Sequence, residues 1–135
     1  MNIVDISKKE SKKRILVVDD DEKIRKMLGF LLTAKGFAVE SASSGKSAIA
    51  VMEQSMPNLV ILDLMMPQMD GFEVCEAMHA RGYLEKTPVI VLSAYPYSKE
   101  VEKLATLGGI DFMSKPFISS ELLKKANSAI GAKDC

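Results

Sequence analysis

The stretch ILVVDDDEK, residues 15–23, joins four apolar residues directly to four acidic ones. A short, continuous apolar run of this kind is typical of a strand that is buried on both faces of a parallel sheet. Asp21 and Glu22 are well placed to cap a following helix, where a carboxylate contributes about 0.3–1 kcal/mol. Capping does not account for Asp19 and Asp20, because adjacent carboxylates repel one another. The stretch therefore predicts a buried strand that ends at a site with its own chemistry.

Four further segments have the character of strands. Leu59–Leu62 and Val89–Leu92 are continuous apolar runs, as expected for central strands. Ala38–Ser41 and Ile110–Met113 mix polar with apolar residues, which fits the edges of a sheet better than its centre. Segments with apolar residues at helical spacing follow the strands in alternation, within Ile24–Leu31, Ala48–Met52, Val74–Met78, Val101–Ala105 and Leu122–Ile130.

The alternation of strands and helices predicts an α/β fold of the (βα)5 type, a doubly wound sheet of five parallel strands. Three central and two edge strands match the flavodoxin-like order 2-1-3-4-5. Ligands of such sheets bind outside the carboxyl ends of the strands, at the switch point between the first and third strands. We expect residues 14–131 to form this one domain, between a flexible leader (residues 1–13) and a short tail (residues 132–135).

The composition argues against several classes of protein. The 135 residues are 47% hydrophobic and 27% charged, as in a single domain with a sizeable core. Eighteen basic residues balance 18 acidic ones, so no nucleic-acid-binding surface is indicated. No segment is long and apolar enough to cross a membrane, and Met1–Lys13 is too polar for a signal peptide. Cys75 and Cys135 match no metal or disulfide spacing, which favours a reduced, cytoplasmic protein.

Polar residues follow four of the five predicted strands. Asp19 and Asp20 come after the first strand, Asp63 after the third, Ser93 after the fourth and Lys115 after the fifth. Three carboxylates at one sheet edge suit Mg²⁺, which binds few protein carboxylates and keeps several waters. A lysine in the same cluster indicates an anionic ligand, and phosphate fits because the lysine and the metal would neutralise its oxygens. Since an aspartate can be a covalent nucleophile towards phosphoryl groups, Asp63 is the candidate acceptor.

These residues stand in motifs that resemble those of the receiver domain of two-component response regulators. The motifs are VVDDD, LDLMMPQMDG, VLSA and FMSKPF, which begin at Val17, Leu62, Val91 and Phe112. The resemblance covers about residues 14–131, nearly the whole chain, and the motifs together, at these spacings, are highly specific.

The resemblance implies a role for each residue at the strand ends. Asp63 would accept a phosphoryl group from a phosphohistidine of a sensor histidine kinase or a histidine phosphotransfer protein. Asp20, Asp63 and the backbone carbonyl of Met65 would ligate Mg²⁺, while Asp19 would act mainly through a metal-bound water. The phosphate-binding and switch positions would be held by Ser93, Ala94, Phe112 and Lys115, and the peptide bond between Lys115 and Pro116 would be cis.

The resemblance also implies a two-state mechanism. Phosphorylation would draw Ser93 towards the phosphoryl oxygens and open space into which Phe112 turns. The fourth helix, the fifth strand and the fifth helix would then shift together, and their surface would bind a downstream protein or a second copy of the chain. The protein would thus be a monomer or a phosphorylation-dependent dimer. It would not be an enzyme beyond its own phosphorylation and dephosphorylation, and it would bind neither nucleic acid nor membrane.

Other functions remain open from the sequence. The chain could be a phosphorelay intermediate that passes the phosphoryl group on to a histidine phosphotransfer protein. It could also be a receiver excised from a longer regulator with an output domain. A metal-dependent phosphatase is disfavoured, because such enzymes usually place a second acid two residues after the nucleophile, where this chain has Met65.

Overall fold

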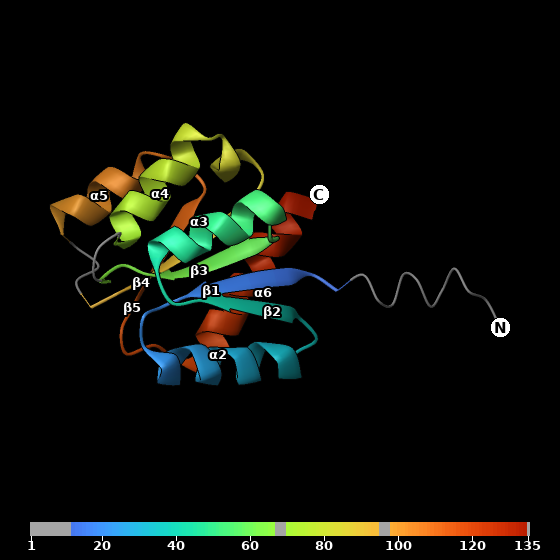
Figure 1. Cartoon of the computed structure of the whole chain (residues 1–135). Coiled ribbons are helices and arrows are strands. Elements are labelled where there is room, and N and C mark those ends of the chain that lie inside the picture. The colour runs from blue at the N-terminus through green and yellow to red at the C-terminus, as the bar shows by residue number, and fades with distance from the viewer. Residues whose placement is uncertain (1–11, 67–69, 95–97, 135) are drawn as a thin grey trace.

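The computed structural model describes residues 12–66, 70–94 and 98–134, with side chains through residue 131. Strands and helices alternate along these residues, as the spacing of apolar residues predicts (Figure 1). In chain order the elements are β1 (Arg14–Val18), α2 (Glu22–Ala34), β2 (Ala38–Ala42), α3 (Gly45–Gln54), β3 (Leu59–Asp63), α4 (Gly71–Ala80), the 3-10 helix η1 (Tyr83–Glu85), β4 (Val89–Ser93), α5 (Lys99–Ala105), β5 (Ile110–Ser114) and α6 (Ser119–Asp134).

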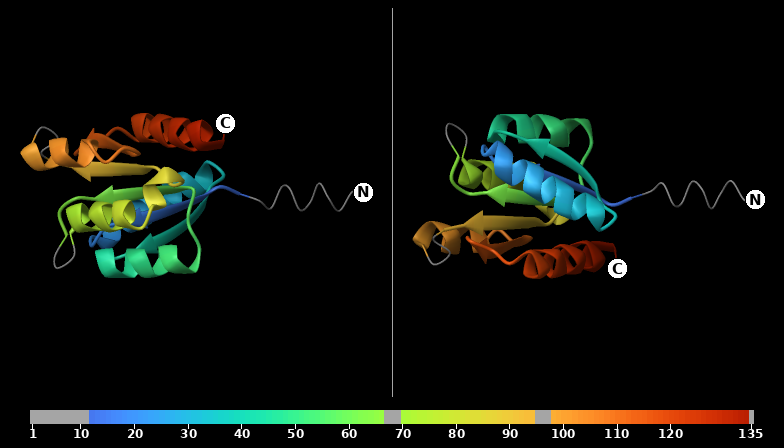
Figure 2. Two further views of the ribbon diagram at one scale, coloured as in Figure 1. Left: turned by 90° about the horizontal axis from the view of Figure 1, so that it is seen from above. Right: turned by 90° about the horizontal axis from the view of Figure 1, so that it is seen from below.

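The strands form one parallel sheet in the order β2-β1-β3-β4-β5. The predicted strand order and fold class are therefore confirmed. Helices cover both faces of the sheet, with α3, α4 and α5 on one face and α2 and α6 on the other (Figures 1 and 2). The chain thus has the three-layer architecture of a doubly wound fold.

The central strands contribute side chains to the core on both faces of the sheet. Along β1, Leu16 and Val18 pack with residues of α3, α4 and α5, whereas Ile15 and Val17 pack with residues of α2 and α6. All residues of β3 and β4 are buried, but β2 and β5 are largely exposed or half-buried, as expected for edge strands. Each fully buried aliphatic side chain contributes about 1.5–3 kcal/mol, so this two-sided burial explains why the central runs are continuous.

Side chains cap the N-termini of α2 and α3, and the cap of α2 is at Asp21, as the sequence predicts. Asp21 is the N-cap of α2 and accepts a hydrogen bond from the N–H of Lys23 at 2.9 Å. Ser44 caps α3 in a reciprocal capping box with Ser47. Helix α2 is followed by Gly36 at φ 96°, a left-handed conformation that favours glycine.

The predicted limits of the domain differ in detail from the helix ends. Helix α6 continues to Asp134, so the division placed at residue 131 lies inside a helix rather than at its end. Residues 1–11 of the predicted leader, and Cys135, are outside the described residues. In the part of the chain that the structure describes, no helix is long and apolar enough to span a membrane.

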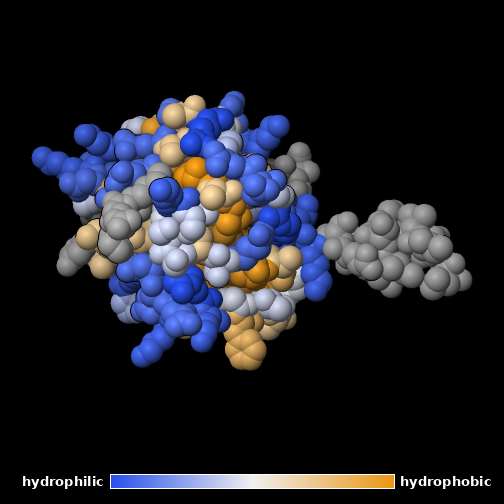
Figure 3. Space-filling view, viewed as in Figure 1, coloured by the Kyte–Doolittle hydropathy of each residue, from blue (hydrophilic) through white to orange (hydrophobic). Residues whose placement is uncertain are grey.

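The surface is mostly hydrophilic, with smaller apolar patches between charged residues on the face that Figure 3 shows. Among the described residues, the exposed large hydrophobic side chains are Met27, Phe30, Met65 and Ile118. Met27 and Phe30 lie one turn apart on α2 and line one shallow hollow, together with Leu31, Ala34 and Ser119.

Candidate functional site

The carboxyl ends of the strands bring the predicted polar residues to one edge of the sheet. Lys115 follows β5, and its backbone N–H donates to the carbonyl of Ser93, the last residue of β4, at 2.8 Å. The Lys115 ammonium reaches across the edge, with Nζ 2.9 Å from Asp63 Oδ1 and 3.8 Å from Asp19 Oδ2. Residues separated by up to 96 positions in the chain, from Asp19 to Lys115, therefore form one cluster.

Three carboxylates line this edge. Asp19, Asp20 and Asp63 each offer one oxygen, and these oxygens all lie within 4.8 Å of one another. Asp19 and Asp63 are buried, with exposed fractions of 2% and 6%, while Asp20 is exposed. Within the described residues, Asp19 Oδ2 is buried and has no hydrogen-bond partner. A buried carboxylate oxygen without a hydrogen bond is costly, and a hard cation such as Mg²⁺ would satisfy it, so the donor set fits that metal.

The environment of the cluster raises the pKa of two of its groups. Burial raises the pKa of Asp19 from 3.8 to about 6, and the charges of Asp63 and Asp20 act in the same direction. The N–H of Asp21 and the ammonium of Lys115 oppose this shift. For Lys115, burial alone would lower the pKa, but the hydrogen bond and charge of Asp63 raise it, so the ammonium stays charged.

The raised pKa of Asp19 predicts that the metal-free protein loses stability as the pH rises. Between the unfolded pKa of about 4 and the folded pKa of about 6, the native state binds a proton that the unfolded state releases. The free energy of unfolding therefore falls across this window, by about 3 kcal/mol in all. Asp19→Asn removes the titration and should raise the unfolding free energy by about 1–3 kcal/mol near pH 7.5, measured by urea denaturation in EDTA.

The control for this prediction is Asp21→Asn. Asp21 is exposed, and an asparagine keeps the cap of α2, so this variant should match the wild type within about 0.5 kcal/mol. If the free energy of unfolding depends on pH in the same way in Asp19→Asn and in the wild type, the Asp19 carboxyl is not the source of that pH dependence.

The start of α4 holds the end of β3 in place. The N–H of Gly71 donates to the carbonyl of Leu64 at 2.9 Å. A Cβ atom on Gly71 would lie 2.6 Å from Leu64 Cα and 2.7 Å from the carbonyl oxygen of Asp63, so only glycine allows this approach. Asp70 caps the helix by accepting from the N–H of Glu73 at 3.0 Å. The glycine in the motif LDLMMPQMDG thus has a packing role directly behind Asp63.

The other predicted site residues lie around the cluster. Ser93 is buried, whereas Ala94 is exposed. Phe112 on β5 is half-buried and packs against the core layer of α3, α4 and α5. The side chain of Met65 is 65% exposed, which leaves its carbonyl as the expected contribution to the site. The Lys115–Pro116 peptide bond is cis, the isomer that the family resemblance implies.

Sequence reasoning missed one residue that contacts the cluster. Arg25, on α2, donates from Nη1 to the backbone carbonyl of Asp19 at 2.7 Å. A cation close to a helix N-terminus is unfavourable for the helix dipole, but Lys23 and Lys26 share this place, so the sequence did not single out Arg25.

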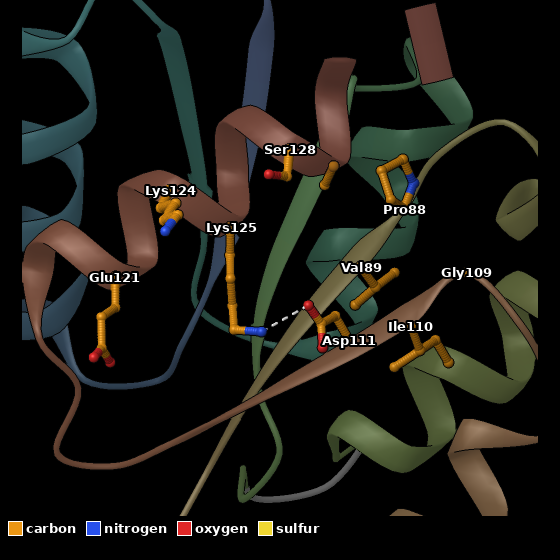
Figure 4. Close-up of a pocket in the computed structure, with 10 residues that line it drawn as sticks. Pro88, Val89, Gly109, Ile110, Asp111, Glu121, Lys124, Lys125 and Ser128 are labelled. Carbon is orange, nitrogen blue, oxygen red and sulfur yellow. Dashed lines mark hydrogen bonds and ion pairs between the residues drawn. The ribbon is translucent and has the colours of Figure 1, made fainter. Parts of the chain in front are cut away.

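A hollow of about 650 Å³ lies away from this cluster, between β5 and α6 (Figure 4). Its lining includes Pro88, Val89, Gly109 and Ile110, which precede or begin β4 and β5, at the opposite ends of these strands from Ser93 and Lys115. Lys125 on α6 bridges it by an ion pair with Asp111, with Nζ 2.9 Å from Oδ2. Asp111 Oδ1 also accepts from the N–H of Phe112 at 2.8 Å, so the exposed edge of β5 is linked to α6.

Comparison with known proteins identifies the class of protein that this fold and site define. The family model described as response regulator receiver domain matches residues 15–127. The chain therefore belongs to the family of response-regulator receiver domains, which are modules of two-component systems that pair with histidine kinases.

Curated relatives agree with this assignment. The chain is 37% identical over 117 residues to the response regulator MprA of Mycolicibacterium vanbaalenii, across 87% of this chain and 50% of that protein. It is 36% identical over 123 residues to the probable transcriptional regulator ycf27 of Porphyridium aerugineum, across 91% of this chain and 50% of that protein. The chain thus spans about half the length of these relatives.

Solved structures show the same fold. The chemotaxis protein CheY4 of Vibrio cholerae superposes with a TM-score of 0.79 at 30% identity, over 88% of this chain and 99% of that one. The receiver domain of the Francisella response regulator 1452 gives a TM-score of 0.82 at 27% identity, over 90% of this chain and 98% of that one.

Proposed function

We propose that this receiver domain accepts a phosphoryl group on Asp63 in a Mg²⁺-dependent reaction and changes its partner-binding surface in response. The observation that carries the proposal is the hydrogen bond from Lys115 Nζ to Asp63 Oδ1, beside a cluster of three carboxylates. An ammonium next to an excess of carboxylates prepares the site for an anion that is held together with a metal cation.

Asp63 has the environment of an attacking group. Its Oδ1 accepts from Lys115, and its carboxylate makes no other hydrogen bond within the described residues. One oxygen is therefore held in place while the other is available to attack phosphorus. The new bond joins a carboxylate oxygen to phosphorus, the bond from phosphorus to the donor imidazole nitrogen breaks, and that nitrogen keeps the electron pair.

The neighbouring residues would stabilise the charge that this transfer brings to the site. The Lys115 ammonium can pair with a phosphoryl oxygen, and the Ser93 hydroxyl can donate to another. Asp19, Asp20, Asp63 and the Met65 carbonyl would hold Mg²⁺, which supplies positive charge opposite the phosphoryl oxygens when bound. Asp19 Oδ2, which has no hydrogen-bond partner in the described region, is the oxygen with most to gain from a cation or its water.

The response would pass through β5 and its neighbours. Phe112 lies two residues before Ser114, which is paired with Ser93 in the β4–β5 register. A Ser93 hydroxyl drawn towards the phosphoryl group would leave space for Phe112, and α5, β5 and α6 would shift between two packings. A tenfold preference of a partner for one packing needs only about 1.4 kcal/mol, so a modest change in this face is sufficient.

The proposed partners are a sensor histidine kinase or a histidine phosphotransfer protein as donor, and a protein target or second copy of the chain on the α5–β5–α6 face. Since the curated relatives are about twice as long, an output domain joined to this receiver in a longer regulator remains an alternative. Onward transfer to a histidine phosphotransfer protein, as a relay intermediate, is the other. In each case the proposed chemistry is confined to the chain's own aspartyl phosphate, and the proposed location is the cytoplasm.

The experiment that tests the proposal is phosphorylation by acetyl phosphate, followed by intact-mass spectrometry. In Mg²⁺ the wild-type protein should gain the mass of one phosphoryl group, and this gain should be absent in excess EDTA. The reason is that the charges of Asp19, Asp20 and Asp63 would repel the anion without a cation. Circular dichroism in EDTA serves as the control for folding. A folded protein that gains no mass in Mg²⁺, or gains it equally in EDTA, contradicts the proposal.

A further inference from the structure

The guanidinium of Arg25 reaches the acidic cluster from the adjacent helix rather than from a strand end. Its Nη1 donates to the carbonyl oxygen of Asp19 at 2.7 Å, and the side chain is half-buried beside β2. The contact is to the backbone, so it does not neutralise a carboxylate directly. The hydrogen bond instead fixes the position of the chain between β1 and α2.

Three hydrogen bonds hold Asp19. Its N–H donates to the carbonyl of Ala42 on β2 at 3.1 Å, and its Oδ1 accepts from the N–H of Asp21 at 2.9 Å. The bond from Arg25 holds its carbonyl. With N–H, carbonyl and Oδ1 all fixed, the remaining oxygen, Oδ2, is directed to the cluster, where Lys115 Nζ is 3.8 Å away.

The hydrogen bond from Arg25 to the Asp19 carbonyl also affects the position of Asp20. The carbonyl of Asp19 and the nitrogen of Asp20 belong to one planar peptide unit, so fixing the carbonyl also fixes the direction in which Asp20 leaves the strand. The Asp20 carboxylate is exposed and makes no hydrogen bond to any described residue. Its position in the cluster therefore depends on the backbone that carries it.

We infer that Arg25 is a positioning residue for the metal site, and that its hydrogen bond to the Asp19 carbonyl sets the affinity of the three-carboxylate cluster for Mg²⁺. The inference rests on the proposed function, because it concerns the same site. Groups that orient metal ligands without touching the metal typically change metal affinity by about 10–100-fold.

The direction in which Mg²⁺ affinity changes when Arg25 is removed distinguishes positioning by its hydrogen bond from an effect of its positive charge. A cation near the site repels Mg²⁺, so removing Arg25 would tighten Mg²⁺ binding if only its charge mattered. Removing it weakens binding if its hydrogen bond matters.

The test is isothermal titration of the metal-free protein with MgCl₂, without any phosphodonor. Arg25→Met, which keeps the aliphatic stem and removes the donors, should weaken Mg²⁺ binding about tenfold. Arg25→Lys keeps a charged donor, but its stem is one bond shorter than the path to Nη1, so the hydrogen bond to the Asp19 carbonyl is lengthened and Mg²⁺ should bind about threefold more weakly than in the wild type. The matched control is Lys26→Met, which removes the same charge from the next residue. Lys26 is 77% exposed and pairs with Glu22, so its Mg²⁺ affinity should stay within twofold of the wild type.

Each outcome has one meaning. Mg²⁺ affinity in Arg25→Met equal to or tighter than in the wild type overturns the inference but leaves the proposed function intact. A lowered melting temperature in EDTA with unchanged Mg²⁺ affinity does the same, since it shows a merely structural role. If Arg25→Met does not fold, Arg25→Lys decides, and wild-type affinity in that variant overturns the inference. No saturable Mg²⁺ binding by the wild type would instead remove the metal from the proposed function.

Discussion

Asp63→Asn will abolish phosphoryl uptake from acetyl phosphate in Mg²⁺, with no mass gain detectable by intact-mass spectrometry. An amide oxygen is a much weaker nucleophile than a carboxylate, and it also donates less charge to a metal. The substitution is nearly isosteric at a buried position at the end of β3, so the fold and the contact with the start of α4 should survive. The loss therefore measures chemistry rather than folding.

The matched control is Asp70→Asn. Asp70 lies seven residues further along the chain as the N-cap of α4, and asparagine caps helices as well as aspartate does. This variant should gain the same mass as the wild type under the same conditions. A residual gain in Asp63→Asn that tandem mass spectrometry places on another acid, such as Asp19 or Asp20, would move the acceptor within the cluster and refute its assignment to Asp63.

The features that sequence predicted correctly are those set by local pattern and by topology. Continuous apolar runs identified the central strands because both faces of these strands are buried. Once the strand order was inferred, the residues after each strand had to meet at one edge, and Lys115 does meet Asp63 there. The cap of α2 at Asp21 followed from residue type alone.

The features that sequence did not predict depend on the exact direction of side chains. Asp19 and Asp20 are identical and adjacent, and both follow Val18, the last residue of β1, yet Asp19 is buried and Asp20 is exposed. The contact of Arg25 with the Asp19 carbonyl depends on how α2 packs beside β2, which no motif specifies. Helix α5 ends at Ala105, where Thr106 closes it through a hydrogen bond from its hydroxyl to the carbonyl of Lys103, a contact that the apolar spacing of this helix does not reveal.

Lys115→Met will slow phosphoryl uptake about 100-fold at saturating Mg²⁺. The ammonium of Lys115 is the hydrogen-bond donor to Asp63, and removing one preorganised donor from a site where charge develops costs about 10²–10³ in rate. The measurement is the initial rate of mass gain at a fixed concentration of acetyl phosphate. Removal of the ammonium also leaves Asp19 and Asp63 without a cation that competes with Mg²⁺, so uptake should need less Mg²⁺ for half its maximal rate.

Lys125→Met is the matched control, because it removes a lysine that makes a similar ion pair away from the carboxylate cluster. Lys125 pairs with Asp111 at the same 2.9 Å that separates Lys115 Nζ from Asp63 Oδ1, and the two lysine side chains are similarly exposed, at 37% and 30%. The pairs differ in place: one lies at the carboxyl ends of the strands beside three carboxylates, the other across the hollow between β5 and α6. Uptake in Lys125→Met should stay within about threefold of the wild type, because exposed pairs contribute little. Equal rates in both variants would mean that Lys115 is an ordinary ion-paired lysine and that the anion is held by other groups.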